Sequence, residues 1–157
     1  MLWSPPTSTV DPENSNWNAL LDPSVQKIAI ANPAHAPYGR AAVAALQKAG
    51  IYDKIQAKLV YGENISQAAQ FVESGNAQAG IIALSLALSP AMQNGKRWEI
   101  PADMYPPLLQ AAVVLSASTN KSPARDFLDY ITSADGHKVL AKYGFARPST
   151  GSQAQGK

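Results

Sequence analysis

The sequence predicts an α/β fold with a mainly parallel sheet. Three short apolar runs, at residues 27–32, 57–62 and 79–84, have the length and composition of buried strands. Two segments with apolar residues at helical spacing follow the first two runs, at residues 38–49 and 65–72. Strands that alternate with helices along a chain are typical of a sheet whose neighbouring strands run parallel.

The first third of the chain contains one clear strand and one clear helix. Residues 1–26 are rich in Pro, Ser, Asn and Asp, which predicts an irregular segment with a strand at Leu2–Trp3. The run Lys27–Asn32 is β-branched and ends at a proline, as expected for a buried strand. Tyr38–Ala49 is the first predicted helix, with a proline suited to its first turn and a glycine placed to end it.

The middle of the chain repeats this alternation. Ala57–Gly62 is the second predicted strand. Asn64 or Ser66 can cap a second helix over Ile65–Val72, because short polar side chains accept hydrogen bonds from the first helical N–H groups. The apolar run Ala79–Leu84 is the third predicted strand.

The rest of the chain predicts two further strands and two further helices. Residues 85–95 are expected to form helical turns, and residues 96–101 a short strand. Leu108–Ser116 has the apolar, β-branched composition of a strong strand. Helices are expected over Ser122–Ile131 and from Ser133 to Tyr143.

Composition excludes several classes of function. The chain has 157 residues, 46% hydrophobic and 15% charged, which suits a folded soluble protein with one domain or two small lobes. A net charge of +2 is too small to argue for a nucleic-acid partner. The chain has no cysteine, so it contains neither a disulfide nor a zinc–thiolate site. No run approaches the roughly 20 apolar residues of a membrane span. The start MLWSPPTS does not read as a signal peptide, so the chain reads as cytoplasmic or as a mature or truncated piece of an exported protein.

Two strand-to-helix junctions, residues 32–40 and 61–67, are the most informative stretches. Both follow predicted parallel strands, so both are expected at the carboxyl edge of the sheet, where such sheets bind ligands. A helix start carries unpaired N–H groups and a partial positive charge, and two starts facing one pocket form an anion site. The candidate oxyanion-binding residues are Tyr38, Gly39, Asn64, Ile65 and Ser66, with Gly39 allowing close approach to the backbone.

Each candidate also has a plainer interpretation. The two junctions are equally consistent with ordinary loops that carry good capping residues. Arg40 is either a cation for the ligand or a surface residue, and His35 is either a ligand or a hydrogen-bonded loop residue. Glu63 has no evident carboxylate partner for acid–base chemistry. We find no catalytic set and no clustered metal ligands in the sequence.

The sequence also closely resembles the periplasmic molybdate-binding proteins of ABC importers (the ModA family), which are type II periplasmic binding proteins. The resemblance lies in the motifs HAPYG and GENIS and in four stretches, residues 28–55, 58–87, 101–115 and 124–145. It implies a two-lobed fold that holds molybdate or tungstate between its lobes with neutral hydrogen-bond donors. On this basis the backbone N–H groups of Tyr38 and Ile65 are ligands, Ala83 replaces a tyrosine found in some members, and the Tyr38 hydroxyl is a possible substitute.

The resemblance further implies a division of the chain. Residues 1–26 are expected to be an irregular segment with a crossover strand, and residues 27–107 the second, ligand-binding lobe. Residues 108–147 would supply the return strand and C-terminal helices of an incomplete first lobe, and residues 148–157 a disordered tail. The early half-lobe of the family, with its serine or threonine donors, has no counterpart here, so we expect an N-terminally truncated form with weakened or lost affinity.

Three functions therefore remain in competition. The first is the solute-binding component of an ABC importer, with a membrane permease as partner and a periplasmic location by resemblance. The second is a ligand-free protein–protein interaction module, such as a stress or metal-resistance factor derived from the family. An enzyme of small anionic substrates ranks last, because no acid–base or nucleophile set is present. The apolar face of residues 122–143 predicts a homodimer or a swapped arrangement.

Overall fold

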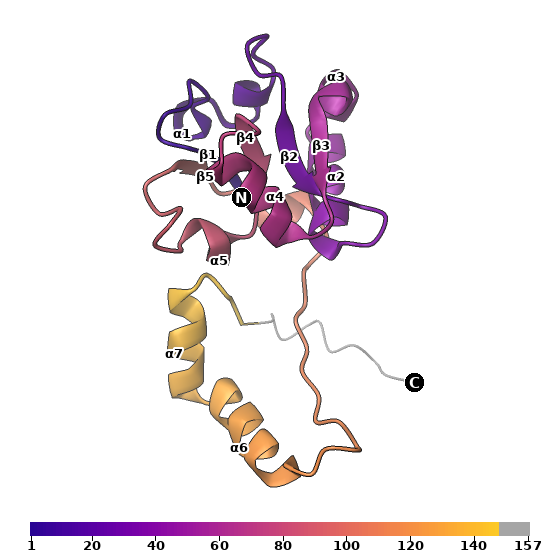
Figure 1. The fold of residues 1–157 in the computed structure, drawn as a ribbon, viewed down its shortest axis with the longest axis vertical. Coiled ribbons are helices and arrows are strands. Elements are labelled where there is room, and N and C mark those ends of the chain that lie inside the picture. The colour runs from indigo at the N-terminus through magenta and orange to yellow at the C-terminus, as the bar shows by residue number, and fades with distance from the viewer. Residues whose placement is uncertain (148–157) are drawn as a thin grey trace. The chain divides into compact units, whose positions relative to one another are not determined.

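The computed structural model describes residues 1–147 of the chain, which divide into two compact units. Unit 1 comprises Met1–Leu108, and unit 2 begins at Leu109. Figure 1 shows a sheet with surrounding helices in unit 1 and two consecutive helices in unit 2.

Unit 1 contains all the strands in the described part of the chain. Its strands are β1 (Leu2–Ser4), β2 (Ile28–Ala31), β3 (Leu59–Gly62), β4 (Ala79–Ile81) and β5 (Lys96–Trp98). Its α-helices are α1 (Pro12–Ser15), α2 (Pro37–Lys48), α3 (Tyr52–Ile55), α4 (Ile65–Glu73) and α5 (Leu84–Ala87). Three 3₁₀ turns complete it: η1 (Asn16–Leu20), η2 (Gln56–Lys58) and η3 (Ala102–Met104).

The strands form one mixed sheet in the order β3-β2-β4-β1-β5. The α/β class is confirmed, and β2 pairs in parallel with both β3 and β4. β1, however, pairs antiparallel with both β4 and β5, so the prediction of a mainly parallel sheet is wrong for half of the pairings. The parallel pairs are those joined by crossover helices, whereas β1 has no helical crossover before it and inserts between β4 and β5.

The two crossover helices cover opposite faces of the sheet. On one face, α2 packs Ala45 and Leu46 into a core that includes Ile28 and Ile30 of β2. On the other face, α4 packs Ala68, Ala69 and Val72 into a second core, which also contains Trp3 and Ala29. Right-handed crossovers require this arrangement, because the chain moves from β2 outward to β3 and then back past β2 to β4.

Unit 2 consists of helices α6 (Lys121–Thr132) and α7 (Ala134–Lys142). Ser133 ends the first helix and caps the second, since its Oγ accepts a hydrogen bond from the Gly136 N–H at 3.2 Å. A side chain at Gly136 would collide with the Tyr130 and Ile131 carbonyls, so glycine allows the two helices to approach closely. Gly136 is the only residue of these two helices that is buried.

Three sequence predictions need correction. Leu108–Ser116 was expected to be a strand, but it has no strand partner among residues 1–147 and forms no strand. A strand requires ladder hydrogen bonds to a neighbour, which composition alone does not provide. The segment expected to be irregular contains α1 and η1, because the Asp11 carboxylate caps the chain at Glu13. The short helix α3 was not predicted, and the expected disordered tail lies outside the described residues.

Candidate functional site

The two junctions singled out in the sequence lie side by side at one edge of the sheet. β2 and β3 are parallel neighbours, and their last residues, Ala31 and Gly62, are paired in register. The Asn32 N–H extends this pairing by donating a hydrogen bond to the Gly62 carbonyl at 2.7 Å. Because α2 and α4 then leave toward opposite faces, this edge is the position at which open α/β sheets bind ligands.

The first junction leaves a single backbone donor free at the start of α2. The Asn32 side chain accepts the Ala34 N–H at 3.0 Å, and the Asn32 carbonyl accepts the Ala36 N–H at 2.9 Å. The Ala36 carbonyl in turn accepts the Gly39 N–H at 3.0 Å. The Tyr38 N–H has no hydrogen-bond partner among residues 1–147. Of the two candidates in this loop, Tyr38 is therefore the free donor.

Gly39 has a packing role that its sequence context did not reveal. The residue is buried in the first turn of α2, and a Cβ atom there would collide with the Ala31 carbonyl at the end of β2. Glycine thus lets the helix start lie directly against the strand that precedes it. The close approach is between two parts of this chain, and it fixes the Tyr38 amide next to the edge of the sheet.

The second junction leaves three backbone donors free at the start of α4. The Asn64 side chain caps the helix by accepting the Gln67 N–H at 3.0 Å, which is one of the two caps that the sequence allowed. The Gln67 side chain reaches back and accepts the Glu63 N–H at 2.7 Å. The N–H groups of Asn64, Ile65 and Ser66 have no partner among the residues that the structure describes. Capping thus satisfies the groups on either side of these three donors and leaves the three available to a ligand.

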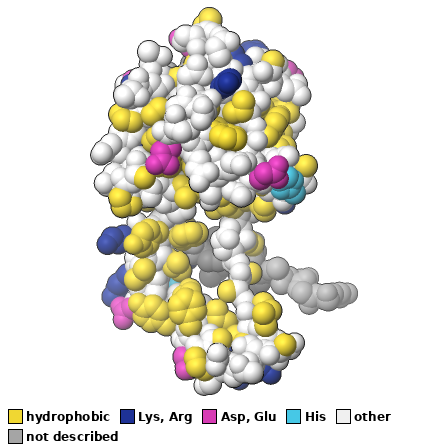
Figure 2. All heavy atoms as spheres, viewed as in Figure 1, with side chains coloured by type: hydrophobic (Ala, Val, Ile, Leu, Met, Phe, Trp, Pro, Cys, Tyr) yellow, Lys and Arg dark blue, Asp and Glu magenta, His cyan; other side chains and the backbone are white. Residues whose placement is uncertain are grey.

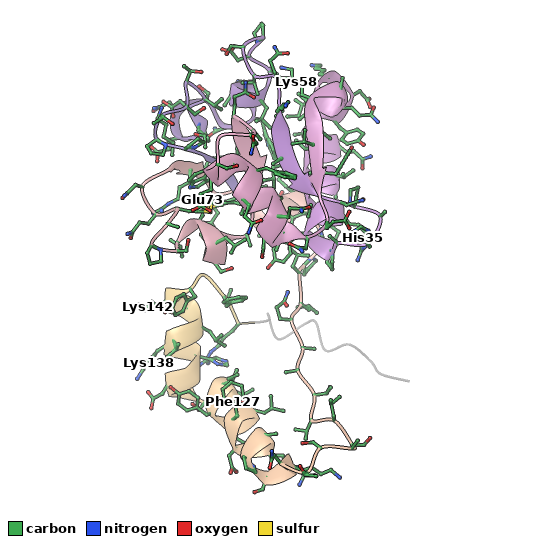
Figure 3. The ribbon with its side chains drawn as sticks, viewed as in Figure 1. His35, Lys58, Glu73, Phe127, Lys138 and Lys142 are labelled. Carbon is green, nitrogen blue, oxygen red and sulfur yellow. The ribbon has the colours of Figure 1, made fainter. Side chains whose placement is uncertain are left out.

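A side chain of the first junction is bonded to the backbone of the second. The His35 Nε2 lies 2.8 Å from the Glu63 carbonyl oxygen and 3.4 Å from the Glu63 carboxylate. His35 is therefore a hydrogen-bonded loop residue, which is one of the two interpretations that the sequence allowed. Figure 3 shows His35 in the loop that follows β2.

The remaining side chains near this edge make no hydrogen bond to either junction within the described residues. Arg40 is exposed on α2. Burial raises the pKa of Tyr105, and the Glu99 carboxylate and the Tyr38 phenol contribute to the rise. Ala83 is buried, with 5% of its surface exposed.

Sequence reasoning missed two residues that shape the site. Asn32 folds the first junction, and its position directly after a strand and before a proline is a typical turn signal. Gln67 braces the second junction, and its spacing of three residues from Asn64 is the spacing of a capping box. Both signals were present in the sequence, but only the hydrogen bonds show which donors they consume.

The described residues also form a surface hollow away from this edge of the sheet. A hollow of about 300 Å³ is lined by Gln26, Lys27, Gly75, Asn76 and Gln78, which lie at the opposite, amino end of β2. No three His, Asp or Glu side chains within residues 1–147 are grouped to hold a metal ion. None of the helices in this range combines the length and the hydrophobicity that crossing a bilayer requires.

The chain is similar to known molybdate-binding proteins. The chain is 36% identical to the molybdate-binding protein ModA of Rhodobacter capsulatus over 145 residues, covering 92% of this chain and 55% of the relative. It is also 36% identical to ModA of Azotobacter vinelandii over 146 residues, covering 92% of this chain and 57% of the relative. The chain thus spans about half the length of these curated relatives, which are binding proteins and not enzymes.

Solved structures of molybdate-related binding proteins have a similar fold. The periplasmic molybdate-binding protein of Azotobacter vinelandii superposes with a TM-score of 0.77 at 27% identity, covering 94% of this chain and 64% of that one. The substrate-binding domain of a putative molybdenum ABC transporter from Clostridium difficile superposes with a TM-score of 0.72 at 26% identity, covering 94% and 62%. The family model for bacterial extracellular solute-binding proteins matches residues 1–146. The chain belongs to the bacterial extracellular solute-binding protein family.

Proposed function

We propose that unit 1 binds a tetrahedral oxyanion, molybdate or tungstate, at the shared edge of β2 and β3. The observation that carries this proposal is the set of unpaired amides at two adjacent helix starts, Tyr38 on α2 and Asn64, Ile65 and Ser66 on α4. Gly39 supports the site by seating α2 on β2. Helix starts with free N–H groups attract anions through both hydrogen bonding and the helix dipole.

The chemistry of these groups favours an anion without protons. All four are donors, so they suit a dianion whose oxygens only accept hydrogen bonds. A protonated phosphate would bring its own donor, for which this set offers no acceptor. Molybdate, tungstate and sulfate are therefore the ligand class, and the similarity to molybdate-binding proteins favours the two larger ions. These two have nearly the same size and charge, so we expect similar affinities for both.

Calorimetry with the 157-residue chain tests this proposal. We expect saturable binding of molybdate and tungstate, with phosphate at neutral pH giving no signal. Each hydrogen bond from a backbone N–H to a charged oxygen contributes about 1.5–3 kcal/mol to the binding free energy. The described donors all come from a single unit. We therefore propose an affinity in the micromolar range or weaker, below that of a family member of full length. Absence of heat with molybdate, tungstate and sulfate would contradict the proposal.

The biological setting follows from the family. We propose that the chain acts as the solute-binding component of an ABC importer, delivers the oxyanion to a membrane permease, and works in the periplasm. The support is the family match and the periplasmic location stated for the Azotobacter protein. A pull-down of the permease with the anion-loaded chain, compared with the ligand-free chain, tests this part of the proposal.

We also propose that unit 2 associates with a second copy of itself. Its helices expose large apolar side chains, among them Phe127 at 61% and Tyr130 at 52%. Figure 2 shows hydrophobic side chains gathered over these helices, and Figure 1 shows residues 109–116 as an extended, unpaired trace. Val113 in this trace is 78% exposed. An extended apolar segment with free backbone groups is a template for strand pairing between identical chains.

Light scattering coupled to size exclusion tests self-association. We expect a dimer at micromolar concentration, and we expect the double substitution Val113→Asp with Phe127→Asp to shift it to monomer. Lys138→Ala, on an exposed and charged position of α7, serves as the control that leaves the dimer intact. A monomeric wild-type chain at 100 μM would contradict the proposal. If the chain dimerises but ignores every oxyanion, a ligand-free interaction module becomes the better description of its function.

A further inference from the structure

We infer that His35 is a positioning residue that sets the direction of the Asn64 backbone N–H, one of the four donors of the candidate site. The inference deepens the proposed oxyanion binding and, in its use for a ligand, depends on it. It is carried by one contact between segments that are 28 residues apart in the chain, the bond from the His35 ring to the Glu63 carbonyl.

The identity of the acceptor fixes the chemistry of this contact. A backbone carbonyl only accepts hydrogen bonds, so the His35 Nε2 at 2.8 Å must carry the proton and donate it. The Glu63 carboxylate, 3.4 Å from the same nitrogen, is a second acceptor and favours the same arrangement. The contact therefore requires either the Nε2–H tautomer or the imidazolium, and both donate in the same direction.

Peptide geometry transmits this contact to the site. The Glu63 carbonyl and the Asn64 N–H belong to one planar trans peptide group, in which they point in opposite directions. When the His35 ring holds the carbonyl on one side, the Asn64 N–H is held pointing to the other side. No residue from 1 to 147 accepts that N–H, so the histidine orients a donor without consuming it.

A second bond holds the neighbouring peptide group. The Glu63 N–H donates to the Gln67 Oε1 at 2.7 Å, and Gln67 is itself fixed by the Asn64 cap. The backbone of Glu63 is thus held at its N–H from within α4 and at its carbonyl from the β2–α2 loop. Gln67 holds the N–H side of Glu63 from within α4, whereas His35 holds its carbonyl side and relates the second junction to the first.

Global stability does not account for this link. The side chains of His35 and Glu63 are 51% and 77% exposed, and polar contacts between exposed groups contribute little to the free energy of unfolding. A positioning role therefore predicts a local effect at Asn64 and on anion binding, with little change in melting temperature. A merely structural role predicts the opposite pattern.

Three variants of the full 157-residue chain test the inference. His35→Ala removes the donor, and His35→Gln restores an amide N–H at a similar distance from the backbone. His137→Ala is the matched control, because the His137 Nδ1 also contacts a backbone carbonyl, that of Ile131 at 3.1 Å, but in unit 2. The readouts are the heteronuclear NOE and chemical shift of the Asn64 amide in the ligand-free protein, the melting temperature, and the molybdate dissociation constant.

We expect His35→Ala to lower the NOE at Asn64 and to raise the molybdate dissociation constant about tenfold, equivalent to about 1.4 kcal/mol. His35→Gln should recover most of both effects, and His137→Ala should change neither. An Asn64 amide that is unchanged in His35→Ala overturns the inference, whatever happens to binding. If the amide loses order in that variant but the wild-type chain binds no molybdate, the positioning role stands and the proposed function fails.

Discussion

Helices α4 and α6 differ in what they bury, although both are amphipathic. α4 in unit 1 buries Ala68, Ala69 and Val72 against the sheet. α6 in unit 2 is longer, at 12 residues against 9, yet none of its residues is buried. An apolar stripe therefore indicates that a helix needs a surface to pack against, but it does not show that such a surface is present.

The strands explain this difference. In unit 1 helix α4 packs on β2, β3 and β4, which are paired with one another within the unit. The segment with strand composition that leads into unit 2, residues 108–116, has no strand beside it in the described part of the chain. A helix gains most of its stability from the packing of its apolar face, so we expect α6 and α7 to be less stable than α4.

The largest effect is expected from one of two side-chain truncations, one in the core of unit 1 and one on the exposed face of α6. Leu46 is fully buried on α2, so Leu46→Ala should lower the free energy of unfolding by about 2–5 kcal/mol. Phe127 on α6 is 61% exposed, and Phe127→Ala should change the free energy of unfolding by less than about 0.5 kcal/mol. Urea unfolding measures both changes when it is followed by tryptophan fluorescence, which reports on unit 1 because Trp3, Trp17 and Trp98 all lie there, and by helical circular dichroism, which also reports on unit 2. Equal losses for the two variants would contradict the comparison.

A smaller effect is expected at the first helix start. Gly39→Ala places a methyl group against the Ala31 carbonyl, so it should destabilise unit 1 by about 1–3 kcal/mol and weaken molybdate binding. The neighbouring change Arg40→Ala, at an exposed position, should leave both nearly unchanged. Urea denaturation of the two variants measures the change in stability, and calorimetry measures the change in molybdate affinity. A larger loss of affinity in Arg40→Ala would mean that the anion is held by a charged side chain.

The smallest effect is expected from removing helix caps. Asn64→Ala loses the bond to the Gln67 N–H and should cost unit 1 about 1 kcal/mol. Ser133→Ala removes the equivalent cap of α7 in unit 2. We expect it to lower the helical circular dichroism without moving the tryptophan-detected midpoint. A shift of that midpoint in Ser133→Ala would show that the two units unfold together.

Much of the site was predictable because its donors follow from local sequence. A strand, a short polar loop and a helix start were visible at residues 27–49 and 57–72, and they predict free amides at Tyr38, Asn64, Ile65 and Ser66. Sequence could not tell that the Gly39 amide is bonded to the Ala36 carbonyl, because that depends on the first turn of α2. Nor could it pair His35 with Glu63, since their contact depends on β2 and β3 being neighbours.

The sequence by itself determined the elements that rest on short-range physics: the strand at Ile28–Ala31 and the helices α2, α4, α6 and α7. It offered Asn64 or Ser66 as the cap of α4, and the hydrogen bond to the Gln67 N–H selects Asn64. Propensity, periodicity and capping act over a few residues, so they can be read in order along the chain. Only the tertiary structure decided which strands pair, that β1 runs antiparallel between β4 and β5, and that residues 108–116 form no strand. Those outcomes depend on hydrogen-bond partners from distant parts of the chain, and a pattern within one segment carries no information about whether such a partner is present.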